Sequence, residues 1–297
     1  MQIYCISALR FVRCVRRSAE KPFFRFGLSM HIGLARVATS FAFLTARPIN
    51  VAMSAAPHER AVLWDVDGTL VESTKLAFDA TNEVLKAQGK EPINVDEYKV
   101  GCKYTTPERF NFHMGLETGN ALGAELGQIF DDTYVARVSK ETAGLFDGMD
   151  KLLRSLALAG HPQGALSNAC GAYVRAVMTA NELDEAPPPD MRMALFRVAL
   201  GADEVPKAKP DPDGLLMCCE KLGVQAENGV YVGDSPSDGK AARAAGMKAV
   251  GVLWGANGAE ALEEHFDVLC EDVPSLIKAL RGILNPDEGK VAEGSWN

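Results

Sequence analysis

The stretch AVLWDVDGTLVES, residues 61–73, runs from a short apolar segment straight into two aspartates, Asp65 and Asp67, and then into Gly68 and Thr69. An Asp-Gly pair is a common signal for a hairpin, so the simplest interpretation is a turn. The other interpretation is a reactive site, because parallel α/β sheets bind ligands at the carboxyl ends of their strands. The rest of the chain decides between the two.

The composition is that of an ordinary globular protein with an acidic balance. The chain has 297 residues, of which 47% are hydrophobic and 24% charged, and its net charge is -8. An acidic chain has no electrostatic support for general binding of nucleic acid, and no apolar run approaches the ~20 residues of a membrane span. The seven cysteines are odd in number and include no Cys-x-x-Cys pair, so they indicate neither a disulfide framework nor a zinc site. From the acidic charge and the lack of a long apolar run, we expect neither a nucleic-acid partner nor a membrane partner.

Residues 1–57 differ from the rest of the chain in charge. They carry eight arginine and lysine residues and one acid, Glu20, together with scattered serines. Such an arginine-rich, acid-poor segment is typical of an organelle transit peptide, so we expect delivery to a plastid or a mitochondrion. The alternative is a disordered tail, or a true start at Met30 or Met53, and the protein would then be cytoplasmic.

Short apolar segments alternate with amphipathic ones along the rest of the chain. Buried strands are expected at residues 61–65, 164–168, 195–200, 229–234 and 249–255. Helices are expected at residues 74–89, 148–160, 172–181 and 211–223, and after Pro274. This alternation predicts an α/β fold with a doubly wound, mostly parallel, Rossmann-like sheet that is covered by helices on both faces.

The first two expected strands are separated by about 100 residues, which is far more than a crossover connection needs. Residues 95–138 have a mostly helical pattern, so we expect a helical cap domain inserted over the sheet. The expected division is a leader at 1–57, an α/β core at 58–73 and 145–285, a helical cap at 74–144 and a tail at 286–297.

Polar residues that could do chemistry stand at or just after the expected strands. They are Asp65 and Asp67, Ser167 and Asn168, Lys209, and Asp234 with Asp238. Each alone has an ordinary explanation, such as a turn, a helix cap or a solvated loop. Because the carboxyl ends of parallel strands meet at one edge of a sheet, their order favours a single shared site.

Four motifs fall at these positions: DVDGT at 65–69, SN at 167–168, KAKPDP at 207–212 and GDSPSD at 233–238. Together they resemble the four ordered motifs of the haloacid dehalogenase superfamily of phosphohydrolases. The segments at 145–160 and 251–280 look most like its phosphoglycolate phosphatase branch. The resemblance implies a helical cap of the first type and a Mg²⁺-dependent phosphomonoesterase. It also implies a small anionic phosphate ester as substrate, with 2-phosphoglycolate as the best single candidate.

The same residues indicate how such a reaction would proceed. A carboxylate that attacks a phosphoryl group is repelled by its charge, and a bridging divalent cation removes that obstacle. Asp65 is the candidate nucleophile, which would form an aspartyl-phosphate. Asp67 would protonate the leaving oxygen and later activate water. Lys209 would stabilise the developing charge, with Lys207 as its competitor.

The expected metal is Mg²⁺, which prefers oxygen ligands. Asp65 would contribute a carboxylate oxygen and Asp67 its backbone carbonyl. Asp234 would contribute a second carboxylate. Asp238 would support the metal from the adjacent turn, either directly or through water.

Phosphate oxygens are expected to meet groups at the ends of the first and second strands. Ser167 and the backbone amides near Gly68 would bind them. Asn168 would orient the phosphate and Thr69 would brace the loop after the nucleophile. For both of these, helix capping or loop hydrogen bonding is an equal alternative.

Substrate selection is expected in the cap, because a cap that closes over the site can contact the leaving group. The segment at 100–110 is the candidate, with Lys103 and Arg109 contacting a substrate carboxylate or a second phosphate. The alternative is that both are solvated surface charges.

Two other functions stay open at this stage. A sugar phosphomutase of the β-phosphoglucomutase kind shares the motifs and the cap type. A non-catalytic relative that binds a phosphometabolite would be expected to lack Asp65 or a metal ligand, and none is missing. Neither the exact substrate nor the oligomeric state can be read from the sequence.

Overall fold

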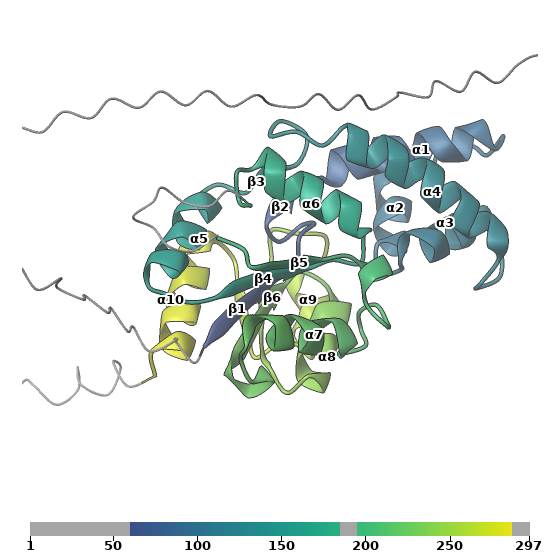
Figure 1. The fold of residues 1–297 in the computed structure, drawn as a ribbon. Helices are drawn as coiled ribbons and strands as arrows, with labels where there is room; N and C mark the ends of the chain where they lie inside the picture. Colours follow the sequence, from purple (N-terminus) through teal and green to yellow (C-terminus); the bar gives the residue numbers. More distant parts are fainter. Residues whose placement is uncertain (1–59, 185–194, 287–297) are drawn as a thin grey trace, which may run out of the picture. The chain divides into compact units, whose positions relative to one another are not determined.

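The computed structural model describes residues 60–184 and 195–286, and Figure 1 shows how their elements are arranged. The predicted leader and most of the predicted tail lie outside these residues, so neither prediction is tested. Within the described ranges, no helix has both the length and the apolar character that crossing a membrane requires.

Six strands form one sheet in which every neighbouring pair is parallel. In spatial order they are β5 (Val198–Leu200), β4 (Gln163–Leu166), β1 (Ala61–Trp64), β6 (Gly229–Gly233), β7 (Lys248–Val252) and β8 (Val268–Cys270). The chain winds outward from β1 in both directions, so the predicted doubly wound parallel sheet is confirmed. The central strands β1 and β6 are neighbours, which brings their carboxyl ends side by side.

Two edge strands differ from the sequence prediction. The strand expected from residue 195 begins only at Val198, where its ladder with β4 starts. Leu195 and Phe196 are buried ahead of the strand, which explains the longer apolar run. Strand β8 was not expected, because it has three residues and only Cys270 is buried. A short, half-exposed edge strand has no clear apolar pattern.

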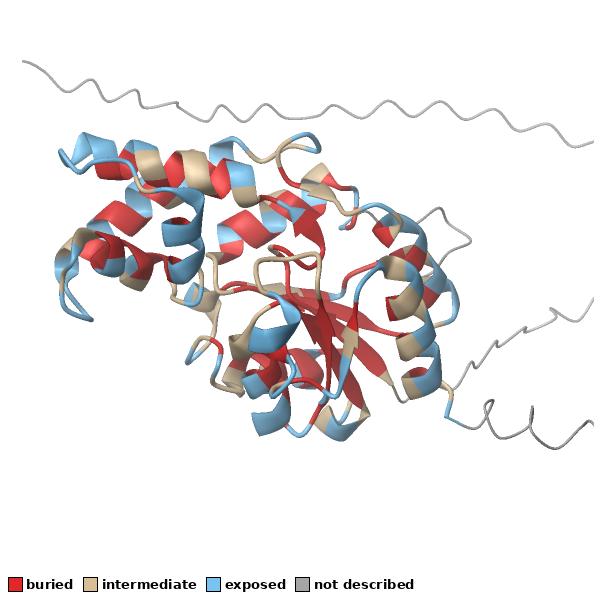
Figure 2. Cartoon of the chain, turned by 180° about the vertical axis from the view of Figure 1, so that it is seen from behind, coloured by how far each residue is buried: buried red, intermediate tan, exposed pale blue. Residues whose placement is uncertain are grey.

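Helices cover both faces of the sheet. One face is covered by α5 (Met149–Leu158), α6 (Gly171–Ala180) and α10 (Val273–Leu284). The other is covered by α7 (Asp213–Leu222), α8 (Pro236–Ala244) and α9 (Ala259–Leu262). Successive side chains of a strand point to opposite faces, so Val62 and Trp64 of β1 join the first layer, and Ala61 and Leu63 join the second. Figure 2 shows the strands buried between these layers.

Two 3₁₀ turns, η1 (Ala202–Glu204) and η2 (Ala226–Asn228), precede α7 and β6. Neither was anticipated from the sequence pattern.

Four helices lie between the first and second strands of the sheet and form the cap. They are α1 (Thr74–Ala87), α2 (Val95–Gly101), α3 (Thr106–Met114) and α4 (Ala121–Ala136). The chain enters and leaves the cap through β2 (Val71–Glu72) and β3 (Gly144–Leu145), which pair antiparallel. Phe110 and Phe130 are buried in the cap, and their cluster continues into the sheet domain. Helix α4 packs beside α6, so the cap rests on the first helical layer (Figure 1).

Candidate active site

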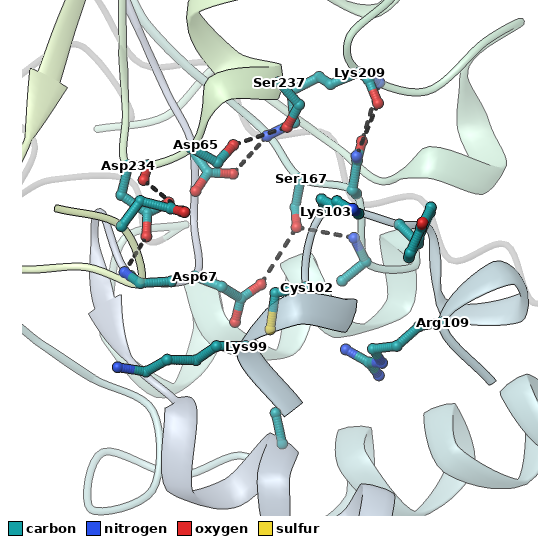
Figure 3. Close-up of a pocket in the computed structure, with 18 of the residues that line it drawn as sticks. Asp65, Asp67, Lys99, Cys102, Lys103, Arg109, Ser167, Lys209, Asp234 and Ser237 are labelled. Carbon is teal, nitrogen blue, oxygen red and sulfur yellow. Dashed lines mark hydrogen bonds and ion pairs between the residues drawn. The ribbon is translucent and has the colours of Figure 1, made fainter. Parts of the chain in front are cut away.

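A cavity of about 550 Å³ lies where the cap meets the carboxyl ends of the central strands. Its wall includes Asp65 after β1, Ser167 after β4 and Asp234 after β6. Lys209 and the cap residue Arg109 also line it. Figure 3 shows these side chains around one space. The polar residues that the sequence places at separate strand ends therefore meet in one site.

Asp65 is buried at the base of the cavity and is held from two sides. Lys209 Nζ donates to its Oδ1 at 2.6 Å, and Thr69 Oγ1 donates to its Oδ2 at 3.3 Å. Burial raises the pKa of Asp65 well above its usual range, against the opposing effect of Lys209. The neighbouring carboxylates of Asp238 and Asp234 raise it further. A charged Asp65 therefore needs more positive charge than Lys209 alone supplies.

Lys209 is enclosed by oxygen atoms. Its ammonium donates to Asp65 Oδ1 at 2.6 Å, Asp238 Oδ1 at 2.7 Å, the Tyr231 hydroxyl at 2.9 Å and the Leu166 carbonyl at 3.2 Å. Burial alone would lower the pKa of Lys209, but the two carboxylates outweigh it and raise the pKa above its usual value. Lys209 is therefore a fixed cation beside the candidate nucleophile.

Its competitor Lys207 points elsewhere. The Lys207 side chain is 69% exposed and pairs with Asp211 at 3.2 Å. Of the two lysines, only Lys209 contacts Asp65.

The turn that carries Asp238 is the first turn of α8, a helix that was not anticipated from the sequence. Ser235 is the N-cap of the helix, Pro236 occupies the first turn, where a missing N–H costs nothing, and Asp238 accepts from the Ser235 N–H to complete a capping box. Its Oδ1 accepts from Lys209 and Tyr231, and its Oδ2 accepts from the Ser235 backbone N–H at 3.0 Å and hydroxyl at 2.6 Å. Both oxygens are thus engaged, and Asp238 holds Lys209 in place.

The carboxylates at this end of the sheet suit a divalent cation. Asp65, Asp234 and Asp238 each offer an oxygen within 4.8 Å of the others. Lys209 is the one buried lysine of the described residues, so three buried carboxylates share a single ammonium. Burial, and then Asp238, raises the pKa of Asp234 to about 7. A cation with oxygen ligands, such as Mg²⁺, would supply the missing charge, and the donor set fits it.

Two glycines make room for Asp234. Gly68 has a φ of 75° in the left-handed region, and its N–H donates to the Val71 carbonyl at 3.0 Å. A Cβ at Gly68 or at Gly255 would collide with the Asp234 carboxylate. The Asp-Gly pair therefore lies in a turn that is part of the site, and not in a hairpin, because β1 pairs with β4 and β6 while β2 pairs with β3.

Asp67 is fixed by four hydroxyl groups. Its Oδ1 accepts from Ser73 at 2.5 Å, Tyr134 at 3.0 Å and Tyr173 at 2.5 Å. Its Oδ2 accepts from Ser167 Oγ at 3.3 Å. Burial, and then Asp67 itself, raises the pKa of both tyrosines above the usual range, so both remain hydrogen-bond donors.

Asn168 lines the cavity wall, but its amide is occupied. Its Nδ2 donates to the Lys209 carbonyl at 3.0 Å, and its Oδ1 accepts from the Lys209 N–H at 3.0 Å. Asn168 therefore braces the loop that carries Lys209. Ser167 Oγ accepts from the Ala169 N–H at 3.0 Å and still faces the cavity.

The two cap cations that were singled out differ in burial. Arg109 is 9% exposed, with its guanidinium 4.5 Å from the centre of the Phe130 ring. Its Nε and Nη2 are buried and have no hydrogen-bond partner among the described residues. Lys103 also lines the cavity but is exposed. Arg109 is therefore not the solvated surface charge that was the alternative.

Comparison with known proteins identifies the family of this chain. The model of the family described as haloacid dehalogenase-like hydrolase matches residues 62–252. The chain belongs to this family. The resemblance that the four motifs carry is thereby confirmed.

The curated relatives of this hydrolase include bacterial phosphoglycolate phosphatases. The enzyme of Yersinia pestis is 30% identical over 225 residues, which cover 74% of this chain and 93% of the relative. The enzyme of Pseudomonas putida is 28% identical over 236 residues, covering 77% of this chain and 82% of the relative. The likeness spans sheet and cap together.

Solved structures agree on the fold of the hydrolase. A putative phosphoglycolate phosphatase from Lactobacillus delbrueckii superimposes with a TM-score of 0.63 at 21% identity, covering 75% of this chain and 98% of the other. CbbY from Rhodobacter sphaeroides, solved in complex with phosphate, superimposes with a TM-score of 0.60 at 24% identity. The match covers 71% of this chain and 93% of CbbY. At these identities the comparison supports the architecture.

Sequence reasoning missed several side chains of the hydrolase site. Tyr134 and Tyr173 lie inside helical patterns, where a buried aromatic residue is indistinguishable from ordinary core. Tyr231 lies inside strand β6, and its hydroxyl accepts a hydrogen bond from Lys209. Ser73 ends the opening stretch of sequence, but its spacing from Asp67 does not predict the hydrogen bond between them.

Proposed function

We propose that this hydrolase is a Mg²⁺-dependent phosphatase that cleaves a small organic phosphate monoester through an aspartyl-phosphate, with 2-phosphoglycolate as the leading substrate. The observation that carries the proposal is Asp65, buried against Lys209 at the end of β1, with Asp67 two residues on in the same cavity. The curated relatives named phosphoglycolate phosphatase support the choice of substrate.

Asp65 would attack phosphorus. Its Oδ1 is fixed by Lys209, and among the described residues its Oδ2 has only the long Thr69 contact, so Oδ2 is the more available nucleophile. Asp65, Asp234 and the Asp67 backbone carbonyl would hold Mg²⁺, which when bound would neutralise charge between the phosphate and the nucleophile. Lys209 and the Ser167 hydroxyl would stabilise the phosphate oxygens from the other side.

Asp67 would handle the proton. It would protonate the oxygen that leaves with the alcohol and then accept a proton from the water that hydrolyses the aspartyl-phosphate. Its four hydroxyl contacts hold the carboxylate in one orientation, which such a proton transfer requires.

Arg109 supports a substrate with an anionic tail. Its guanidinium is buried in the cavity wall, where Nε and Nη2 have no hydrogen-bond partner among the described residues, and burying N–H groups without acceptors is costly. Burial, and then the Arg109 charge, lowers the pKa of His113 to about 4, so His113 is uncharged near neutral pH and does not compete with Arg109 for an anion. A substrate carboxylate would pair with the guanidinium and offset that cost. Lys103 would contribute from the exposed rim.

The test is release of inorganic phosphate from a panel of phosphate esters, with Mg²⁺ and with chelator. The proposal expects Mg²⁺-dependent release, fastest from 2-phosphoglycolate, and loss of about 10⁴-fold or more in Asp65→Asn. Ser155→Ala, which removes a hydroxyl bonded within α5 and far from the cavity, is the matched control. Release that survives Asp65→Asn would contradict the nucleophile assignment. Isomerisation of a sugar phosphate without release would favour a phosphomutase.

Delivery to a plastid or mitochondrion remains part of the proposal for residues 1–57. Sequencing the N-terminus of the native protein tests it. A mature chain that begins near His58 would support a cleaved leader, and an intact Met1 would contradict it.

A further inference from the structure

The two oxygens of Asp67 have unequal surroundings. Oδ1 accepts hydrogen bonds from Ser73, Tyr134 and Tyr173 at 2.5, 3.0 and 2.5 Å. Oδ2 accepts only one hydrogen bond among the described residues, from Ser167 at 3.3 Å. A carboxylate oxygen has about two lone-pair sites, so three donors fill Oδ1 and leave it no room for a proton.

The two tyrosines that fill Oδ1 come from different parts of the molecule. Tyr134 is on the cap helix α4 and Tyr173 is on α6, which covers the sheet. Their rings stack with centroids 4.2 Å apart and planes 15° apart, and both side chains are buried. Phe130 packs on Tyr134 at 4.8 Å. The stack therefore joins cap and core directly at the Asp67 carboxylate.

We infer that Tyr134 and Tyr173 are positioning residues which saturate Asp67 Oδ1, so that Oδ2 alone exchanges protons with substrate and water. Because Tyr134 belongs to the cap, the arrangement is complete only when the cap is docked on the core. The inference rests on the proposed phosphatase function and on the acid–base role of Asp67 within it.

This geometry implies two proton transfers, both at Oδ2 of Asp67. In the first step the Oδ2–H bond of Asp67 breaks as the proton passes to the bridging oxygen. At the same time a carboxylate oxygen of Asp65 bonds to phosphorus, the P–O bond breaks with its electron pair on the leaving oxygen, and Asp67 is left as a carboxylate. In the second step a water proton passes to Oδ2 while the water oxygen bonds to phosphorus. The bond between phosphorus and Asp65 then breaks, and Asp65 recovers its carboxylate.

The leaving group provides the readout. An alkyl phosphate needs a proton on its departing oxygen, whereas 4-nitrophenyl phosphate leaves as a stable anion without one. Tyr134→Phe, Tyr173→Phe and the double variant keep the stacked rings and remove only the hydroxyls. We expect each single variant to lower kcat/KM for the alkyl ester by about 10-fold and for 4-nitrophenyl phosphate by less than about 3-fold. The double variant should approach the alkyl-selective loss of Asp67→Asn.

The ratio of the two kcat/KM values within one variant is the measured quantity, since any loss of folded protein cancels in it. Ser155→Ala should leave the ratio unchanged. Equal losses on both esters in the tyrosine variants, with Asp67→Asn still selective for the alkyl ester, would overturn the inference and leave the phosphatase function standing. No phosphate release by the wild-type protein would overturn the proposed function and this inference with it.

Discussion

Arg109 places a permanent positive charge where solvent barely reaches it. The guanidinium packs against Tyr98, Phe110 and Phe130, at 5.7, 5.8 and 4.5 Å from their ring centres. Aromatic faces stabilise a cation but provide no hydrogen-bond acceptor in the plane of the guanidinium. At the scale of one residue, we therefore propose Arg109 as a side chain that selects a substrate by its anionic tail.

Replacing Arg109 by methionine should change substrate preference more than catalysis. We expect kcat/KM for 2-phosphoglycolate to fall by about 10- to 100-fold, the worth of a charge-assisted hydrogen bond. A phosphate ester of equal length that ends in a hydroxyl should change little. Lys103→Met is the matched control, because an exposed cation on the same cavity is screened by solvent and should cost about 3-fold or less. Equal losses on both esters would contradict a tail-recognition role.

At the scale of elements, the turn after β1 is the part in which backbone geometry and chemistry are most tightly linked. Gly68 has its left-handed conformation and leaves the space that the Asp234 carboxylate fills. Gly89 has a similar φ of 72° at the end of α1, but a Cβ there would meet nothing within 4 Å. A substitution at Gly89 would therefore strain only the backbone, whereas the same substitution at Gly68 would also crowd the Asp234 carboxylate.

Gly68→Ala and Gly89→Ala should therefore have similar effects on stability but different effects on the site. Both should lose about 1 kcal/mol of unfolding free energy, because alanine is strained at positive φ. Only Gly68→Ala should also weaken Mg²⁺ binding and lower phosphatase activity by about 100-fold or more, because its methyl group displaces Asp234. Denaturation curves and Mg²⁺ titrations of both variants measure this. Normal Mg²⁺ affinity in Gly68→Ala would contradict the account of the turn.

The elements also show what a sequence can and cannot reveal. Strands β1 and β6 could be predicted because each is a fully buried apolar run that ends in a motif. Helix α8 was missed because it begins inside the motif that contains Asp238. The contacts of Tyr134 and Tyr173 with Asp67 could not be predicted, since residues so far apart in the chain are brought together only by the packing of α4 on α6.

At the scale of the whole molecule, we expect the buried carboxylates to make stability depend on pH and on a bound metal ion. The native state keeps a proton on Asp234 up to a pKa of about 7, whereas the unfolded chain releases it near pH ~3.9. Between these two pH values the native state thus binds more protons than the unfolded state. The metal-free protein therefore loses stability as pH rises through that range. A bound cation removes the penalty because it stabilises the ionised carboxylates.

Thermal unfolding at about pH 5 and about pH 8, with Mg²⁺ and with chelator, tests this balance. Mg²⁺ should raise Tm more at the higher pH. The uncharged Asp234→Asn variant should reduce the Mg²⁺ effect and flatten the pH dependence of the metal-free protein. Comparing the Tm values of the wild-type protein and Asp234→Asn cancels the contribution of titrating groups that the substitution does not affect. An equal Mg²⁺ effect at both pH values would contradict a carboxylate cluster completed by a cation.

The central claim is that Asp65 forms a covalent bond to phosphorus during turnover. Rapid quenching of the enzyme with its substrate, followed by borohydride reduction and peptide mass spectrometry, identifies the residue, because an acyl phosphate is reduced to an alcohol. The account predicts homoserine at position 65 and nowhere else, with none in protein quenched without substrate. Reduction at another carboxylate, or none while phosphate is still released, would contradict it.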